Sequence, residues 1–315
     1  MSVILIIVFF ERRFAVSDTA LMSEQFNTYM TYLRKEKNTS DNTLQAYRRD
    51  ISKFLDYAAE NDFDSFEAVT EADMAAYKGS LISSGLSVAT VCRSLSALRS
   101  MYQYLMSKDI VSHNPAREVH NDKIEKKGPN ILSNKEIEAL LAQPNVSDIK
   151  GLRDKAMLEL IYATGIKVTE LISLNVDDLN LSIPFVRVAS VGKERFIPLY
   201  RVAVKALTEY LDKSRKLLIL SSDETALFVN VSGERLTRQG FWKILKDYAS
   251  KAGIKSDITP HTLRHSFAAH LLENGADIHD IQEILGHSDI ASTQRYAQFL
   301  KQRVKTSYIK FHPRA

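Results

Sequence analysis

The chain has 315 residues, 45% of them hydrophobic, with one cysteine and a formal net charge of +4. This length and apolar content allow two domains with real cores and exclude a chain that is disordered throughout. A single cysteine excludes an internal disulfide framework and a cysteine-rich zinc site, which fits a reducing cytosol. The small basic excess permits a polyanionic partner without requiring one.

An apolar run at residues 3–10 opens the chain and is followed by Glu11-Arg12-Arg13. The run is too short to span a bilayer, which takes about 20 apolar residues. A signal peptide would carry its basic residues before the run instead of after it. We interpret residues 1–21 as an N-terminal extension and expect no association with a membrane. A short strand or helix packed on the body is the alternative.

Helical periodicity characterises the next hundred residues, from Met22 to about His120. Ser40 or Asp41 is placed to cap one helix, and further helices are predicted at residues 71–83 and 87–106. The charged stretch after His120 ends in Gly-Pro and shows no periodicity. The pattern predicts a helical domain at residues 22–122, followed by a linker at 123–131.

The second predicted domain, residues 132–315, is mostly helical with a small β-sheet. Ser133 and Glu136 form a capping box at its first helix. Residues 185–188 and 195–198 have the pattern of short strands on either side of a turn that contains glycine. The predicted fold class is therefore mainly α, with a helical domain and a mixed, mostly α domain that holds the sheet.

A helix start after residue 258 brings two basic side chains together. Thr259 is placed as the cap and Pro260 as the first helical residue, so that His261 and Arg264 share a face of the first turn. Leu263 belongs to the opposite, buried stripe. An imidazole and a guanidinium at a helix N-terminus suit a phosphate. Alone, such a pair is more often an ordinary polar helix start.

Further polar side chains follow within a short distance of this pair. Residues 277–285 predict an amphipathic helix, and Gly286 ends it and places His287 at its C-terminal corner. A later helix carries Tyr296. Two histidines, an arginine and a tyrosine between residues 261 and 296 are a stronger signal than any of them alone.

Three motifs together resemble the signature of the tyrosine recombinases, also called the phage integrase family: His261-x-x-Arg264, Leu285-Gly286-His287 and Tyr296. The resemblance extends over nearly everything from Met22 onward. Residues 268–276 and the terminal 312–315 are similar to those of the bacterial Xer-type recombinases. The resemblance implies that 22–122 is a core-binding domain and 132–315 a catalytic domain, which together form a C-shaped clamp around duplex DNA.

The chemistry of that family needs no metal and no cofactor. The resemblance implies that Tyr296 attacks a backbone phosphate and forms a 3′-phosphotyrosyl bond, releasing a 5′-hydroxyl. Arg264, His261 and His287 would stabilise the charge on the phosphorane oxygens. A hairpin lysine would protonate the departing 5′-oxygen.

Two departures from the family pattern concern catalytic positions. The family carries Thr-Gly-Leu-Arg-x-x-Glu-Leu, whereas this chain has Lys167 at the place of the arginine. Lysine keeps the charge but loses the planar fork that binds two phosphate oxygens. The hairpin is also shorter than the usual Gly-Lys-Gly-Asn-Lys-Glu-Arg. Lys193 is thus the candidate general acid, with Val191 in the usual lysine's slot, and a solvated turn lysine is the alternative.

Three functions are compatible with these residues. We favour a cytoplasmic site-specific recombinase that acts on duplex DNA with paired inverted half-sites, in a homo- or hetero-tetramer, with a DNA translocase as a candidate activator. Its task would be chromosome dimer resolution, and so chromosome partition at cell division, or mobile-element integration. The alternative is a catalytically impaired DNA-binding relative, because of Lys167. A type IB topoisomerase would act as a monomer, and the Xer-like tail argues against it.

The tail and the basic side chains suggest further contacts. Val304, Tyr308 and Ile309 give the last segment an apolar face, which would dock into a neighbouring subunit or fold on its own domain. Six residues are candidate DNA contacts: Arg238, Gln239 and Lys243 near Trp242, and Lys78, Arg93 and Arg99 in the first domain. Such contacts would make DNA binding fall steeply with salt.

Overall fold

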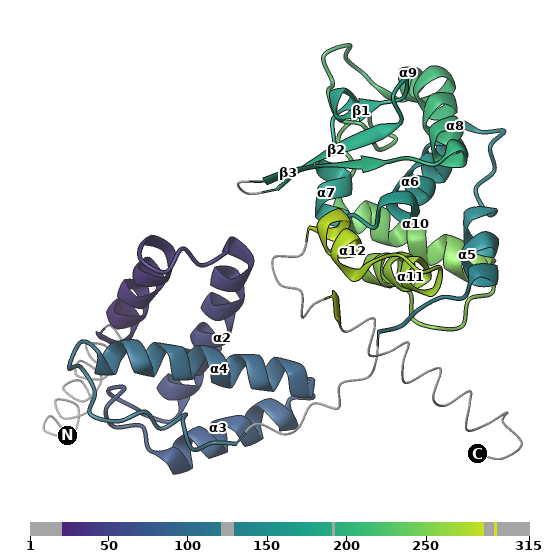
Figure 1. The fold of residues 1–315 in the computed structure, drawn as a ribbon. Helices are drawn as coiled ribbons and strands as arrows, with labels where there is room; N and C mark the ends of the chain where they lie inside the picture. Colours follow the sequence, from purple (N-terminus) through teal and green to yellow (C-terminus); the bar gives the residue numbers. More distant parts are fainter. Residues whose placement is uncertain (1–20, 121–128, 191–192, 287–292, 295–315) are drawn as a thin grey trace, which may run out of the picture. The chain divides into compact units, whose positions relative to one another are not determined.

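The structure is a computed structural model, and it describes residues 21–120, 129–190, 193–286 and 293–294 (Figure 1). The chain divides into two compact units, Met1–Lys126 and Lys127–Ala315. The predicted N-terminal extension lies outside the described residues except for its last position, and so does most of the predicted linker. Among the described helices, none is both long and apolar enough to cross a membrane.

The first unit is entirely helical in its described part. Its residues 21–35 form one helix, and three further helices follow: α2 (Asp41–Glu60), α3 (Glu71–Ser83) and α4 (Val88–Met106). Of the two predicted caps for α2, Ser40 is the one found, because its hydroxyl accepts from the Thr43 N–H. The predicted helix at 87–106 starts one residue later, since Ser87 is its cap and its hydroxyl accepts from the Thr90 N–H. The four helices bury one apolar core rich in aromatic rings.

The second unit is a helical body with a small sheet, as predicted. Its elements in chain order are α5 (Asn134–Leu141), α6 (Ile149–Thr164), α7 (Val168–Ser173), η1 (Val176–Asp178), β1 (Leu179–Asn180), β2 (Phe185–Ser190), β3 (Lys193–Pro198), α8 (Arg201–Glu209), the π-helical turn η2 (Tyr210–Arg215), α9 (Lys216–Leu218), α10 (Arg238–Lys251), α11 (Pro260–Glu273) and α12 (Ile278–Leu285). The Ser133 and Glu136 capping box at α5 is confirmed.

The sheet has three antiparallel strands in the order β1-β2-β3. The predicted strands at residues 185–188 and 195–198 are too short, because β2 continues to Ser190 and β3 already begins at Lys193, its cross-strand partner. On the inner face, Val186, Val188 and Ile197 are buried. This alternation fixes the register, since a shift by one residue would turn these side chains to the outer face.

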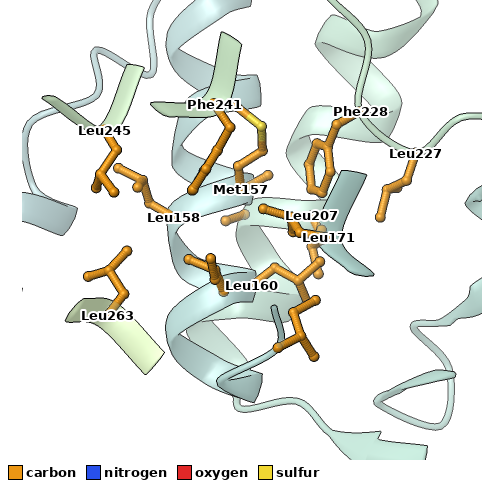
Figure 2. Close-up of a cluster of buried hydrophobic side chains, with 14 of the residues drawn as sticks. Met157, Leu158, Leu160, Leu171, Leu207, Leu227, Phe228, Phe241, Leu245 and Leu263 are labelled. Atoms are coloured by element: carbon orange, nitrogen blue, oxygen red, sulfur yellow. The ribbon is translucent and has the colours of Figure 1, made fainter. Parts of the chain in front are cut away.

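Helix α6 lies at the centre of the second unit's core. Figure 2 shows its side chains Met157, Leu158 and Leu160 surrounded by apolar residues of α7, α8, α10, α11 and the segment after α9. The labelled neighbours are all buried: Leu171, Leu207, Leu227, Phe228, Phe241, Leu245 and Leu263. Because α7 and α11 both pack on α6, their first turns come to lie near the C-terminus of α6.

Helix α11 also binds the segment that enters the second unit. The Leu132 N–H donates to the Ser266 hydroxyl (2.9 Å), and the Leu132 carbonyl lies 2.9 Å from Nε2 of His270. The other ring nitrogen of His270 lies 2.9 Å from the Tyr162 hydroxyl of α6. Ser266 and His270 are buried. Both polar groups of one backbone residue are thus hydrogen-bonded to α11.

Gly165 ends α6 in a conformation that few other residues adopt. Its φ is +59°, and a Cβ there would lie 2.3 Å from Cδ1 of Phe267 in α11. We expect Gly165→Ala to lower the unfolding free energy by about 3 kcal/mol, from backbone strain and overpacking together. Urea unfolding followed by the fluorescence of Trp242, the single tryptophan, measures this loss.

Gly253→Ala is the matched control, because Gly253 has a φ of +69° and open space where a Cβ would stand. Its loss should be only about 1 kcal/mol, from backbone strain alone. Equal losses in the two variants would show that the contact with Phe267 contributes nothing.

Candidate active site

The first turn of α11 has the predicted cap, but its buried and exposed faces carry different residues than predicted. The Thr259 hydroxyl accepts from the Thr262 N–H, and Pro260 is the first helical residue. His261 is exposed, whereas Arg264 is 3% exposed and lies in the interior with Leu263. The predicted arrangement, with Arg264 opposite the buried stripe, is therefore wrong. The interior accepts the guanidinium because it offers backbone carbonyl groups as partners.

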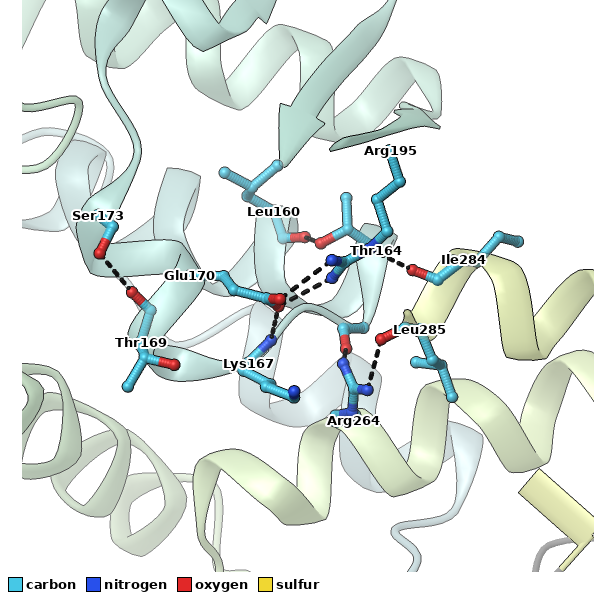
Figure 3. A network of polar contacts seen from close by, with 11 residues as sticks. Leu160, Thr164, Lys167, Thr169, Glu170, Ser173, Arg195, Arg264, Ile284 and Leu285 are labelled. Carbon is cyan, nitrogen blue, oxygen red and sulfur yellow. Dashed lines mark hydrogen bonds and ion pairs between the residues drawn. The ribbon is translucent and has the colours of Figure 1, made fainter. Parts of the chain in front are cut away.

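Arg264 joins the ends of two helices. Its Nη1 donates to the Gly165 carbonyl (2.6 Å) at the end of α6, and its Nη2 donates to the Leu285 carbonyl (2.7 Å) at the end of α12 (Figure 3). Carbonyl groups at a helix C-terminus have no partner within the helix and carry partial negative charge. A buried guanidinium donates hydrogen bonds to these carbonyls and balances their partial negative charge. Arg264 therefore holds α6, α11 and α12 together at one point.

Lys167 lies beside this arginine. It immediately precedes α7, its side chain is exposed, and its N–H donates to Oε2 of Glu170 (2.8 Å). Partial burial lowers the pKa of His261 below its ordinary value of 6.5, and the positive charges of Arg264, Arg238 and Lys167 lower it further. The described structure thus brings three other predicted site residues, Arg264, Arg238 and Lys167, close enough to His261 for their charges to act on its imidazole.

A buried ion pair, which the sequence did not reveal, lies next to these residues. The guanidinium of Arg195 in β3 donates from Nη1 and Nη2 to the two carboxylate oxygens of Glu170 (3.0 and 2.8 Å), and from Nε to the Ile284 carbonyl (2.8 Å). Both side chains are about one-tenth exposed. Glu170 belongs to the family motif that contains Lys167, and Arg195 belongs to the hairpin motif. Their place in these two motifs was the only signal in the sequence that pointed to them.

The carboxylate of Glu170 is held in its charged form. Burial alone raises the pKa of Glu170, but the hydrogen bonds from Arg195, the Lys167 N–H and the charges of Arg195 and Arg264 together outweigh burial. The net result is a pKa below the ordinary value of 4.5. Glu170 is therefore an acceptor for its neighbours at neutral pH and not a proton donor.

The side chains of three predicted catalytic residues, His287, Tyr296 and Lys193, are not placed by the structure. His287 and Tyr296 lie outside the described residues, and so does Val191. The backbone of Lys193 is described as the first residue of β3, opposite Ser190, but its side chain is not. The roles of these groups stay predictions, as does the docking of the segment with Val304, Tyr308 and Ile309.

The predicted DNA contacts fall into two groups. Arg238, Gln239 and Lys243 are exposed on α10 together with Trp242, which is 46% exposed. In the first unit, Arg93 makes a bidentate ion pair with Asp50, Arg99 donates to two carbonyls of the segment after α4, and Lys78 donates to the His120 carbonyl. DNA contacts at all six positions stay predictions.

No metal site is visible in the part of the chain that the structure describes, where no three His, Cys, Asp or Glu side chains cluster closely enough to hold an ion. The groups that gather around His261 are cations. Such a group of cations suits an anion with several oxygen atoms, such as a phosphodiester.

Two family models match the chain. One described as "Phage integrase family" matches residues 130–303, more than half of the sequence, and one described as "Phage integrase, N-terminal SAM-like domain" matches residues 26–109. The chain belongs to the phage integrase family. The resemblance inferred from the motifs is thereby confirmed.

Individual relatives that match nearly the whole chain are tyrosine recombinases. Tyrosine recombinase XerD of Staphylococcus epidermidis is 43% identical over 295 residues, which cover 93% of this chain and 100% of the relative. Tyrosine recombinase XerD of Oceanobacillus iheyensis is 46% identical over 290 residues, covering 91% and 97%. The chain is accordingly a tyrosine site-specific recombinase of Xer type, and the alternative of a catalytically impaired relative is not favoured.

Solved structures agree on the fold. XerA recombinase is 29% identical, with a TM-score of 0.52 and coverage of 94% of this chain and 100% of that one. XerH recombinase in a post-cleavage complex with a palindromic difH substrate is 24% identical, with a TM-score of 0.72 and coverage of 88% and 82%. The mainly α recombinase fold with a small sheet is thus confirmed.

The depressed pKa of His261 gives a measurable property. In the free protein we expect His261 to titrate below 6.5, since three cations and partial burial disfavour the imidazolium. A bound phosphodiester adds a negative charge beside the imidazole and thereby raises the pKa of His261. At a pH between the two values, binding therefore takes up a proton. NMR titration of histidine-labelled protein, with His261→Gln to assign the signal, measures both values.

Lys167→Ala supplies the internal control for this titration. Removing one of the three charges should raise the pKa of His261 in the free protein. A pKa at or above 6.5 in the unsubstituted free protein would contradict the arrangement of charges around the ring.

Proposed function

We propose that this recombinase cuts duplex DNA through a 3′-phosphotyrosyl bond to Tyr296. The hydroxyl oxygen of Tyr296 attacks the scissile phosphorus and loses its proton to solvent, the bond from phosphorus to the 5′-oxygen breaks, and the 5′-oxygen takes a proton from Lys193. In the reverse step, the 5′-hydroxyl of another strand attacks the phosphotyrosyl bond and releases the tyrosine. The observation that carries the proposal is the start of α11, where Arg264 is fixed by two backbone carbonyls and the charges of Arg264, Lys167 and Arg238 act on His261.

Arg264, His261, His287 and Lys167 would stabilise the charge on the phosphorane oxygens. Two of them, His261 and Arg264, stand in the first turn of α11, at the positive end of a helix dipole. Donors that are already in place cost no reorganisation when the charge develops, and each contributes about a hundred- to a thousandfold in rate. Arg264 is fixed by hydrogen bonds to two carbonyls.

The substrate of the proposed reaction is duplex DNA with two inverted half-sites. The XerH structure contains a palindromic difH substrate, which supports a symmetric site for this chain as well. Four subunits, identical or of two kinds, would exchange strands between two such sites in the cytoplasm, with a DNA translocase as activator. The XerD relatives favour chromosome dimer resolution, and thereby chromosome partition, over mobile-element integration.

Tyr296→Phe tests the nucleophile directly. A nicked half-site loses the short strand that carries the 5′-hydroxyl, so that the cleaved intermediate accumulates as a covalent complex on a denaturing gel. We expect the unsubstituted protein to form this complex and Tyr296→Phe to form none, while both bind the intact duplex equally. Specific binding without a complex in the unsubstituted protein would contradict the proposed chemistry.

Lys167→Arg tests the departure from the family pattern. The planar fork of arginine binds two phosphate oxygens at once, so we expect the rate of covalent-complex formation to rise about tenfold, and to fall about a hundredfold in Lys167→Ala. Lys216→Arg, on the exposed surface of α9, is the matched control and should leave the rate unchanged. An unchanged rate in both Lys167 variants would remove this residue from the site.

A further inference from the structure

Within the described residues, Arg195 is the one hairpin residue that binds both α7 and α12, the two helices next to the site. From β3 it reaches α7 through Glu170 and the end of α12 through the Ile284 carbonyl. A guanidinium has five N–H donors in a fixed plane, and this geometry allows it to serve a carboxylate and a carbonyl at the same time. A lysine could not make these contacts together.

The end of α12 leaves room for this guanidinium only because residue 286 is a glycine. Gly286 has a φ of +64°, and a Cβ there would lie 2.9 Å from Nη1 of Arg195. The carbonyls of Ile284 and Leu285 are bound by Arg195 and Arg264 respectively. The carboxylate that anchors Arg195 also accepts from the Lys167 N–H. Arg195 therefore links the hairpin to the backbone segments on which the phosphate-binding groups are mounted.

We propose that Arg195 is a positioning residue that holds the β2–β3 hairpin against α7 and α12, so that the general acid of the hairpin meets the departing 5′-oxygen. The proposal rests on the proposed function. Lys193 precedes Arg195 by two residues on the same strand, so any shift of β3 relative to α7 moves both. Without Arg195, the strand loses its hydrogen bonds to Glu170 and to the Ile284 carbonyl, while those of Arg264 to Gly165 and Leu285 remain.

A substrate with sulfur in place of the bridging 5′-oxygen separates positioning of the acid from other effects. Thiols are acidic, with a pKa of about 8.5 for cysteine, so the sulfur departs as a thiolate and needs no proton from the enzyme. Loss of the general acid therefore slows cleavage of the oxygen substrate but not of the sulfur substrate. Loss of a phosphate-binding group slows both.

The experiment measures covalent-complex formation by the full chain on matched oxygen and sulfur half-sites. We expect Arg195→Ala to slow cleavage of the oxygen substrate about a hundredfold or more, the usual contribution of a general acid, and to stay within about tenfold of the unsubstituted protein on the sulfur substrate. Lys193→Ala should show the same pattern.

Two further variants keep the test independent of folding. Arg195→Gln combined with Glu170→Gln leaves no buried charge unpaired and should again be rescued by sulfur. Arg187→Ala is the matched control: Arg187 lies on the same hairpin and also pairs with a carboxylate, Asp178, but is 43% exposed. It should cleave both substrates at the unsubstituted rate.

The outcomes separate the inference from the function on which it rests. Rescue of the Arg195 variants by sulfur supports the inference, and if Lys193→Ala is not rescued in the same series, the acid is another group that Arg195 positions. Equal losses on both substrates, or no loss on either, in both the single and the double Arg195 variant overturn it. If the unsubstituted protein forms no complex with either substrate, the proposed function fails, and the inference with it.

Discussion

The arrangement of the site depends on how the C-terminus of α12 is held. Its last carbonyls carry partial negative charge and have no partners within the helix. Two buried guanidinium groups satisfy them, Arg195 at Ile284 and Arg264 at Leu285. Each guanidinium has a second attachment near the start of α7, at Glu170 and at Gly165 respectively. One pair of arginines thus fixes the strand β3 and the helices α6, α7, α11 and α12 relative to one another.

This arrangement also determines the charge that the site presents. Glu170 stays ionised, and its two oxygens are bound by Arg195 and by the Lys167 N–H. The charge of Glu170 is therefore balanced within the ion pair, while Lys167, Arg238 and Arg264 act together on His261. Such a group of cations is electrostatically unfavourable by itself, and a bound phosphodiester would offset part of the repulsion. Under the proposed function, this cost in the free state is offset by a stronger interaction with the phosphate in the transition state.

Local sequence signals predicted the helix boundaries well, because caps such as Thr259 and Gly286 act within one turn of the chain. The motifs also led to the correct family. The ion pair of Arg195 with Glu170 could not be predicted from local pattern, since its partners are 25 residues apart and meet only when β3 packs beside α7. The burial of Arg264 was missed for a similar reason, because its carbonyl partners belong to two other helices.

The hydrogen bonds between Leu132 and α11 have a mechanical consequence. They use the backbone N–H and carbonyl of that residue, so they persist for any non-proline side chain at this position that fits the core. A pull on the chain from the preceding linker is borne by the hydrogen bond of Asn130 to the Asp257 carbonyl and by those of Leu132 to Ser266 and His270 before it reaches α5. These contacts lie on α11, the helix that carries Arg264, or just before it, so they anchor the entering chain to that helix.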